Sequence, residues 1–233
     1  MTGHTDSGAD SGADSGADPG AGPVRPSPSV GVGPWQGARP ADPHLDPELL
    51  ERGDARNVVD GYRYWRHEAI VADLDERRHE LHIGVENWGH DFNIGSVVRT
   101  ANAFLAREVH IIGRRRWNRR GAMVTDRYQH LRHHPSTEQF LAWARQEGLP
   151  VIAVDNVAGS EPLELFDLPQ RCVLLFGQEG PGVSPEVLEA AAATVAIEQF
   201  GSTRSINAGA AAAVTMHAWI RRHVHGQIPA GGS

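Results

Sequence analysis

The stretch LLFGQEGPGVS, from Leu174 to Ser184, decides how this chain is interpreted. An apolar run ends in a turn whose three glycines follow the spacing GxxGxG, and a carboxylate, Glu179, lies inside that turn. A buried strand followed by a glycine-rich turn is typical of α/β proteins, in which ligands bind beyond the carboxyl ends of the strands. Because a carboxylate repels phosphate, we expect this turn to approach a cation or a hydrogen-bond donor, such as a sulfonium or an arginine.

The glycine spacing of this turn differs from the known phosphate-binding motifs. It reverses the order of the dinucleotide-binding fingerprint, and no acidic partner follows at the required distance. A second glycine-rich stretch, GVGPWQG from Gly31, follows no strand and is not such a motif either. All 22 basic residues are arginine, which excludes a Walker A lysine and a Schiff-base lysine. For 177–182, a strand-to-helix turn that merely needs positive φ angles is the alternative.

Short apolar runs alternate with amphipathic stretches along most of the chain. Strands that are separated by helices of about ten or more residues indicate a parallel sheet covered on both faces. We therefore expect an α/β fold, with a parallel sheet flanked by helices. The expected strands are 82–87, 108–113, 150–156, 172–177 and 194–200, and the expected helices are 94–104, 137–148, one that begins at Ser184, and 207–224.

The N-terminal region differs in composition from the rest of the chain. It holds little besides Gly, Ala, Pro, Ser and Asp, and DSGA repeats three times in succession from Asp6. Such a segment cannot bury enough apolar surface to offset the entropy of ordering. The expected organisation is a disordered arm at 1–45, a helical extension at 46–78 with an amphipathic helix from Leu49 to about Arg78, the α/β domain at 79–226, and a tail at 227–233.

The formal net charge of −7 is unevenly distributed. The first 50 residues carry seven acidic and two basic side chains, so the folded part is close to neutral. Within it, GRRRWNRRG (113–121) places five arginines around Trp117. Such a run is usually a solvated surface, but arginines beside an aromatic ring also suit phosphate contact and base stacking. We expect RNA to contact Arg114, Arg115, Arg116, Arg119 and Arg120.

The cysteine and histidine content favours few special sites. The single Cys172 excludes an intramolecular disulfide, and no apolar stretch approaches the roughly 18 residues that span a bilayer, which fits a cytoplasmic protein without membrane association. His130, His133 and His134 have the i, i+3, i+4 spacing of a helix face but lack a clear fourth ligand, so no metal site is expected. His217 on the last helix is expected to serve packing.

Two further polar clusters lie near expected strand ends. NIGSVVRTANAF (93–104) carries Asn93 and Arg99, which could face an anion; a solvated arginine on an amphipathic helix is the alternative. In FGSTRSINAG (200–209), small polar residues including Ser205 and Asn207 crowd the start of the last helix, together with Arg204. Helix capping is the alternative there, although a cap needs only one such residue.

These motifs, taken in order, resemble a known family. Asn93…Gly95…Arg99, FGxExxG at 176–182 and SIN at 205–207 are similar to the three motifs of the SpoU (TrmH-like) branch of the SPOUT-class RNA methyltransferases. The resemblance covers about 81–225. It implies transfer of a methyl group from S-adenosylmethionine to a ribose 2′-hydroxyl of tRNA or rRNA. It also implies a C-terminal deep trefoil knot, and a homodimer that pairs the knotted regions, for which the Ala-rich last helix with Trp219 is the expected interface.

The resemblance also implies roles for individual residues. Arg99 would grip the target phosphate and stabilise the developing alkoxide, while Glu179 would hold Arg99 or a neighbouring donor. The residues expected to orient ribose and phosphate are Asn93, Ser205 and Asn207. Those expected to contact the cofactor, mainly through main chain and apolar atoms, are Phe176, Gly177, Gly182, Ile197 and Ile206, and Arg204 is expected to contact RNA.

Two rival functions stay open at this point. A catalytically silent RNA-binding protein could keep the fold and the arginines, and it would fail to bind S-adenosylmethionine. A small-molecule transferase on a doubly wound sheet would lack salt-sensitive RNA binding. The sequence does not distinguish tRNA from rRNA as the substrate.

Overall fold

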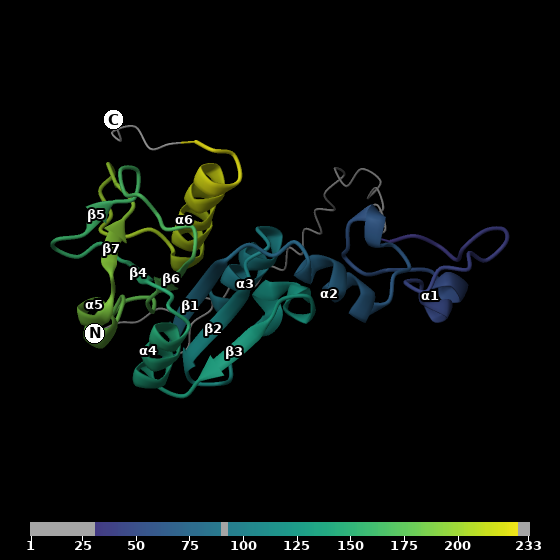
Figure 1. The fold of residues 1–233 in the computed structure, drawn as a ribbon, viewed down its shortest axis with the longest axis horizontal. Coiled ribbons are helices and arrows are strands. Elements are labelled where there is room, and N and C mark those ends of the chain that lie inside the picture. The colour runs from purple at the N-terminus through teal and green to yellow at the C-terminus, as the bar shows by residue number, and fades with distance from the viewer. Residues whose placement is uncertain (1–30, 90–92, 228–233) are drawn as a thin grey trace, which may run out of the picture.

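A seven-stranded parallel sheet organises the chain in the computed structural model, which describes residues 31–89 and 93–227 (Figure 1). The strand order is β3-β2-β1-β6-β4-β7-β5. This confirms the expected parallel sheet with flanking helices. The strands are β1 (Leu81–Asn87), β2 (Glu108–Gly113), β3 (Leu131–His134), β4 (Val151–Val154), β5 (Glu161–Pro162), β6 (Cys172–Phe176) and β7 (Ala193–Ala196).

Helices cover both faces of the sheet. The two central strands β1 and β6 are buried along their whole length, because side chains on both of their faces are covered. On β6, Leu174 belongs to a core with helices α3 and α6, whereas Leu175 belongs to a second core with α4 and α5. The helices are α3 (Ile94–Ala103), α4 (Thr137–Gln146), α5 (Pro185–Ala190) and α6 (Ala208–His223), and two 3₁₀ turns, η2 (Arg119–Ala122) and η3 (Thr125–Arg127), follow β2.

The expected continuous helix from Leu49 to Arg78 is wrong. The segment instead contains α1 (Pro47–Arg52), η1 (Asp60–Tyr62) and α2 (His67–Asp75). Gly53 ends α1 with a φ of +92°, and a Cβ there would lie 2.6 Å from the carbonyl oxygen of Val32. A side chain at position 53 would thus collide with the segment around Val32, which pairs with Asp54.

That pairing partner lies in the expected disordered arm. The first 30 residues of the arm are outside the described part of the chain, but residues 31–45 make specific contacts: Val32 bridges Asp54, and Leu45 bridges Trp65. Asp54 is fully buried. Burial alone would raise its pKa, but hydrogen bonds from the Arg56 side chain and from the Tyr64 and Arg56 amides outweigh burial and lower the pKa to about 2.

The helical interpretation of His130, His133 and His134 is also wrong. His133 and His134 lie on the edge strand β3, where successive side chains point to opposite faces, so the three rings do not share a helix face. His134 faces the second core, and its burial lowers its pKa to about 4. The short strand was missed because LRHH holds a single apolar residue, Leu131, and therefore shows no apolar alternation.

Trp219 on the last helix, α6, was expected at a homodimer interface. Trp219 is 2% exposed and donates to the carbonyl oxygen of Pro169, so it belongs to the core of the single chain. His217 is exposed, although its ring lies 6.1 Å from that of Phe104.

None of the helices in 31–89 and 93–227 combines the length and apolar character that crossing a bilayer requires.

Candidate active site

A cavity of about 380 Å³ opens beyond the carboxyl ends of β4, β6 and β7. This is the edge of a parallel sheet at which ligands are expected to bind. All five residues expected to contact a cofactor line it, as do Glu179, Ser205 and Asn207. The lining is Val154, Asp155, Asn156, Phe176, Gly177, Gln178, Glu179, Gly180, Gly182, Ala196, Ile197, Gln199, Ser205, Ile206, Asn207, Ala208 and Ala211.

The glycine-rich turn after β6 forms one wall of this cavity. Gln178 and Gly182 exchange two backbone hydrogen bonds of 3.0 Å, which fold the turn back on itself. A Cβ on Gly177 would lie 2.0 Å from the carbonyl carbon of Gly182, and Gly180 and Gly182 have φ angles of +99° and +76°. Both the close approach and the backbone conformation therefore demand glycine.

Two carboxylates outside the glycine motif hold the turn in place. Asp155, just past β4, accepts a 2.7 Å hydrogen bond from the amide of Val183. Glu86, fully buried on β1, accepts a 2.7 Å hydrogen bond from the amide of Ser184. The start of α5 is thereby attached to two strands of the sheet.

A chain of side-chain hydrogen bonds joins the three sequence motifs. Asn93 Nδ2 donates to Glu179 Oε2 at 3.1 Å, and Asn207 Nδ2 donates to Asn93 Oδ1 at 2.9 Å. Asn207 Oδ1 also accepts from the amides of Gly209 and Ala210, so it caps α6 as well. The capping alternative is therefore correct, but the same residue also links the first and third motifs.

Close backbone contact positions Asn93 at this junction. Asn93 precedes α3, whose first turn packs against η2: a Cβ on Gly95 would lie 2.7 Å from the amide nitrogen of Ala122. Arg99, further along α3, is exposed and is not among the residues that line the cavity in the described part of the chain. The donor that meets Glu179 is thus Asn93.

The arginine cluster follows β2 and lies beside the start of α3. Arg114, Arg115, Arg116, Arg119 and Arg120 are all exposed, and Arg204 is exposed on the segment that leads to α6. The guanidinium of Arg119 lies 5.4 Å from the Trp117 ring and 3.0 Å from Asp126. Arg119 and Arg120 begin η2, which packs on the first turn of α3, the helix that follows Asn93.

Sequence reasoning missed three residues of the site. Asp155 and Asn156 directly follow β4, whose carboxyl end lies between those of β6 and β7, and the rule that placed the other motifs would have placed them as well. Gln199 also lines the cavity, and within the described residues its buried Oε1 accepts no hydrogen bond. No sequence signal marks Gln199, because only the fold shows that this oxygen is buried.

The cavity has a simple electrostatic character. Among the described lining residues, the charged side chains are Asp155 and Glu179, both acidic. A ligand that carries a positive charge would therefore be stabilised there, and a phosphate would not.

Comparison with known proteins extends this picture. Residues 80–217 match the model of the SpoU rRNA Methylase family. A tRNA (guanosine(18)-2′-O)-methyltransferase from Thermus thermophilus is 26% identical over 159 residues, which span 65% of this chain and 79% of that protein.

Two solved structures share the fold. The TrmH/SpoU tRNA modifying enzyme of A. aeolicus superposes with a TM-score of 0.61 at 22% identity, covering 69% of this chain and 84% of that one. The SpoU methyltransferase AviRb of Streptomyces viridochromogenes, in complex with the cofactor AdoMet, superposes with a TM-score of 0.58 at 24% identity, covering 66% and 62% of the two chains.

Proposed function

The chain belongs to the SpoU rRNA Methylase family, and we propose that it transfers a methyl group from S-adenosylmethionine to a ribose 2′-hydroxyl of tRNA or rRNA. The observation that carries this proposal is the hydrogen-bonded chain Glu179–Asn93–Asn207, which joins the first motif to the two motifs that line the cavity.

The cavity suits S-adenosylmethionine in its volume, its lining and its charge. Its volume of about 380 Å³ lies within the range of small-molecule sites. Gly177 and Gly182 line the cavity with main-chain atoms, while Ile197 and Ile206 supply apolar surface. The carboxylates of Asp155 and Glu179 suit a sulfonium, and the buried Gln199 Oε1 offers an acceptor for a donor of the cofactor, such as its adenine amino group.

S-adenosylmethionine, when bound, supplies an electrophilic methyl group on a positively charged sulfur. The residues of the chain have to place the ribose oxygen in line with it and to lower the cost of its developing negative charge. We assign the orientation of ribose and phosphate to Asn93, Ser205 and Asn207. Glu179 acts as a positioning residue, because it holds the amide of Asn93.

Arg99 is assigned to the substrate phosphate. Its side chain is exposed on α3, and it makes no hydrogen bond or ion pair with the other described residues, so it is available to an RNA ligand. A guanidinium stays charged in proteins and does not accept a proton. Arg99 therefore stabilises the alkoxide and phosphate charge, and the proton goes to the phosphate or to water.

The remaining features of the proposal concern the whole molecule. The chain crosses from β7 to α6 past the glycine-rich turn, a path that suits the deep trefoil knot expected for the fold. The exposed side of α6, with Ala210, Val214 and His217, suits a homodimer interface in place of Trp219. We also propose residues 79–226 as the catalytic domain, 46–78 with 31–45 as an accessory RNA-contacting segment, and the cytoplasm as the location.

The test is methylation of purified RNA by purified protein. tRNA transcripts and rRNA fragments would be incubated with labelled S-adenosylmethionine, and the modified ribose would be mapped. Arg99→Lys and Arg99→Ala are expected to lower turnover strongly while binding of S-adenosylmethionine is kept. Undiminished turnover in both variants would remove Arg99 from the mechanism, and failure of the unmodified protein to bind S-adenosylmethionine would favour a silent RNA-binding protein.

A further inference from the structure

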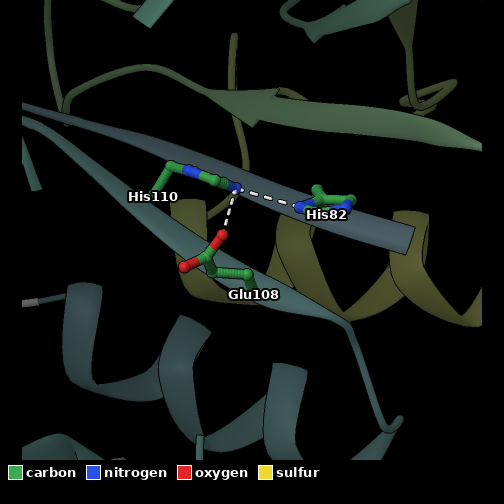
Figure 2. Close-up of side chains that lie close together, drawn as sticks. All are labelled: His82, Glu108 and His110. Carbon is green, nitrogen blue, oxygen red and sulfur yellow. Dashed lines mark hydrogen bonds and ion pairs between the residues drawn. The ribbon is translucent and has the colours of Figure 1, made fainter. Parts of the chain in front are cut away.

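A second cluster of chemically versatile side chains lies at the opposite edge of the sheet. His82 stands near the start of β1, and Glu108 and His110 stand on β2, next to a separate cavity of about 320 Å³ (Figure 2). His82 is in register with Glu108 in the parallel pair, and His110 is two residues further along. Because side chains alternate along a strand, all three project from the same face of the sheet.

The ligand atoms of this cluster converge. Figure 2 shows His110 between the other two residues: its Nε2 lies 3.0 Å from His82 Nδ1 and 3.7 Å from Glu108 Oε2. All three atoms lie within 4.8 Å of one another. In a tetrahedral Zn²⁺ site with bonds of 2.0–2.1 Å, ligand atoms are about 3.3 Å apart. The two separations at His110 lie on either side of that value and the third is at most 4.8 Å, so side-chain rotations would complete the geometry.

The surroundings of the cluster resemble an outer shell of support. His110 Nδ1 lies 3.0 Å from His134 Nε2, so a proton on Nδ1 is directed to His134 and leaves Nε2 free as a ligand. The Trp143 ring packs 4.1 Å from the His110 ring. Arg132 binds Glu108 Oε1 at 3.1 Å, which fixes the carboxylate and leaves Oε2 for a metal.

The cluster is also accessible. His82 and Glu108 line the cavity, whereas His110 is fully buried behind them. The cavity leaves room for a water molecule as the fourth ligand. The other arginines there, Arg107 and Arg171, both pair with Glu80, so their charge is partly compensated.

We propose that His82, Glu108 and His110 bind one Zn²⁺ ion, or a similar divalent first-row metal ion. Two imidazoles and one carboxylate favour Zn²⁺ over Mg²⁺, which prefers oxygen ligands in octahedral geometry. The ion connects β1 to β2 at the edge of the sheet away from the methyl-transfer cavity. Its role is therefore to stabilise the sheet, and it takes no part in methyl transfer.

The experiment uses full-length protein without a polyhistidine tag, freed of metal by a chelator and titrated with Zn²⁺ by calorimetry. We expect one Zn²⁺ per chain and a raised melting temperature, and no comparable response to Mg²⁺. Glu108→Gln and His82→Gln should each weaken Zn²⁺ binding at least tenfold. The control His225→Gln, at an exposed histidine far along the sequence, should bind like the unmodified protein.

Binding of S-adenosylmethionine serves as the check that each variant is folded. Two results would overturn the proposal: unmodified protein that takes up no Zn²⁺, or equal Zn²⁺ affinity in the unmodified protein and the folded His82→Gln variant. The first result does not depend on any variant. It would mean that the three side chains form only a hydrogen-bonded row.

Discussion

The glycine-rich turn allows a sharp test at Gly177. In Gly177→Ala, the new methyl carbon would lie 2.0 Å from the carbonyl carbon of Gly182 and 2.2 Å from the amide nitrogen of Val183. Ordinary contact begins at 3.4 Å, so the opposing backbone must move by about 1.4 Å. The contacted atoms are backbone, and no side-chain rotation can relieve the clash.

The movement has a cost that can be estimated. It disturbs the two 3.0 Å hydrogen bonds between Gln178 and Gly182 and the Val183–Asp155 bond, each worth about 1 kcal/mol. If the substitution raises the free energy of the turn conformation that binds S-adenosylmethionine by about 3 kcal/mol, affinity for the cofactor falls roughly 100-fold. Global stability should change less, because the turn lies at the rim of the sheet.

The assay is calorimetric titration with S-adenosylmethionine, together with thermal unfolding. The matched control is Gly201→Ala, the same chemical change on the neighbouring segment, where an added Cβ meets nothing within 4 Å. The control should bind within about twofold of the unmodified protein. Binding by Gly177→Ala within about threefold would refute the reasoning, because it would show that the turn relaxes freely or does not contact the cofactor.

Three other variants test separate parts of the structure. Gln199→Leu removes the buried Oε1 acceptor and should weaken S-adenosylmethionine binding about tenfold in the same titration, whereas Gln139→Leu at an exposed position of α4 should not. Changing Arg114–Arg116 to Ser should make RNA binding less sensitive to salt: the slope of the logarithm of the RNA association constant against the logarithm of salt concentration should fall by about 0.7–0.9 for each phosphate that these arginines neutralise. Arg145→Ser, at another exposed arginine, is the control. An unchanged slope would exclude Arg114–Arg116 from the RNA interface. Asp54, whose pKa is about 2, contributes stability that is present above pH 4 and lost as the pH falls to 2. Asp54→Asn should therefore cost about 2 kcal/mol in urea unfolding at pH 7 and much less near pH 2, and a pH-independent difference would contradict this.

The sequence predicted those parts of the fold that depend on local pattern. The buried strand 172–176 could be recognised from its run of apolar residues, and the turn after it from the glycines that its positive φ angles require. The edge strand Leu131–His134 leaves no such trace, since polar residues there are stabilised by pairing with β2 and by contacts between rings. Residues 31–45 were misjudged because their contacts depend on long-range pairing, such as Val32 with Asp54, which composition does not reveal.

In the candidate site too, local patterns could be predicted from the sequence, whereas contacts that depend on tertiary packing could not. The three motifs could be placed at one edge of the sheet, but their mutual contacts could not: Glu179 meets Asn93, and this depends on how α3 packs on η2 through Gly95. The strand-end rule could have placed Asp155, whereas Gln199 could be assigned to the site only from the fold, which buries its Oε1 beside the cavity. Spatial adjacency, more than residue type, is what the sequence alone left undetermined.

The double role of Asn207 couples the folding of α6 to the assembly of the polar corner around Asn93. The oxygen of its side chain starts α6, and the nitrogen of the same amide completes the polar corner through Asn93. Without a folded α6, Asn93 Oδ1 lacks this donor, and the hydrogen-bonded chain from Glu179 to Asn207 is incomplete. Docking of α6 and assembly of this polar corner are therefore a single event.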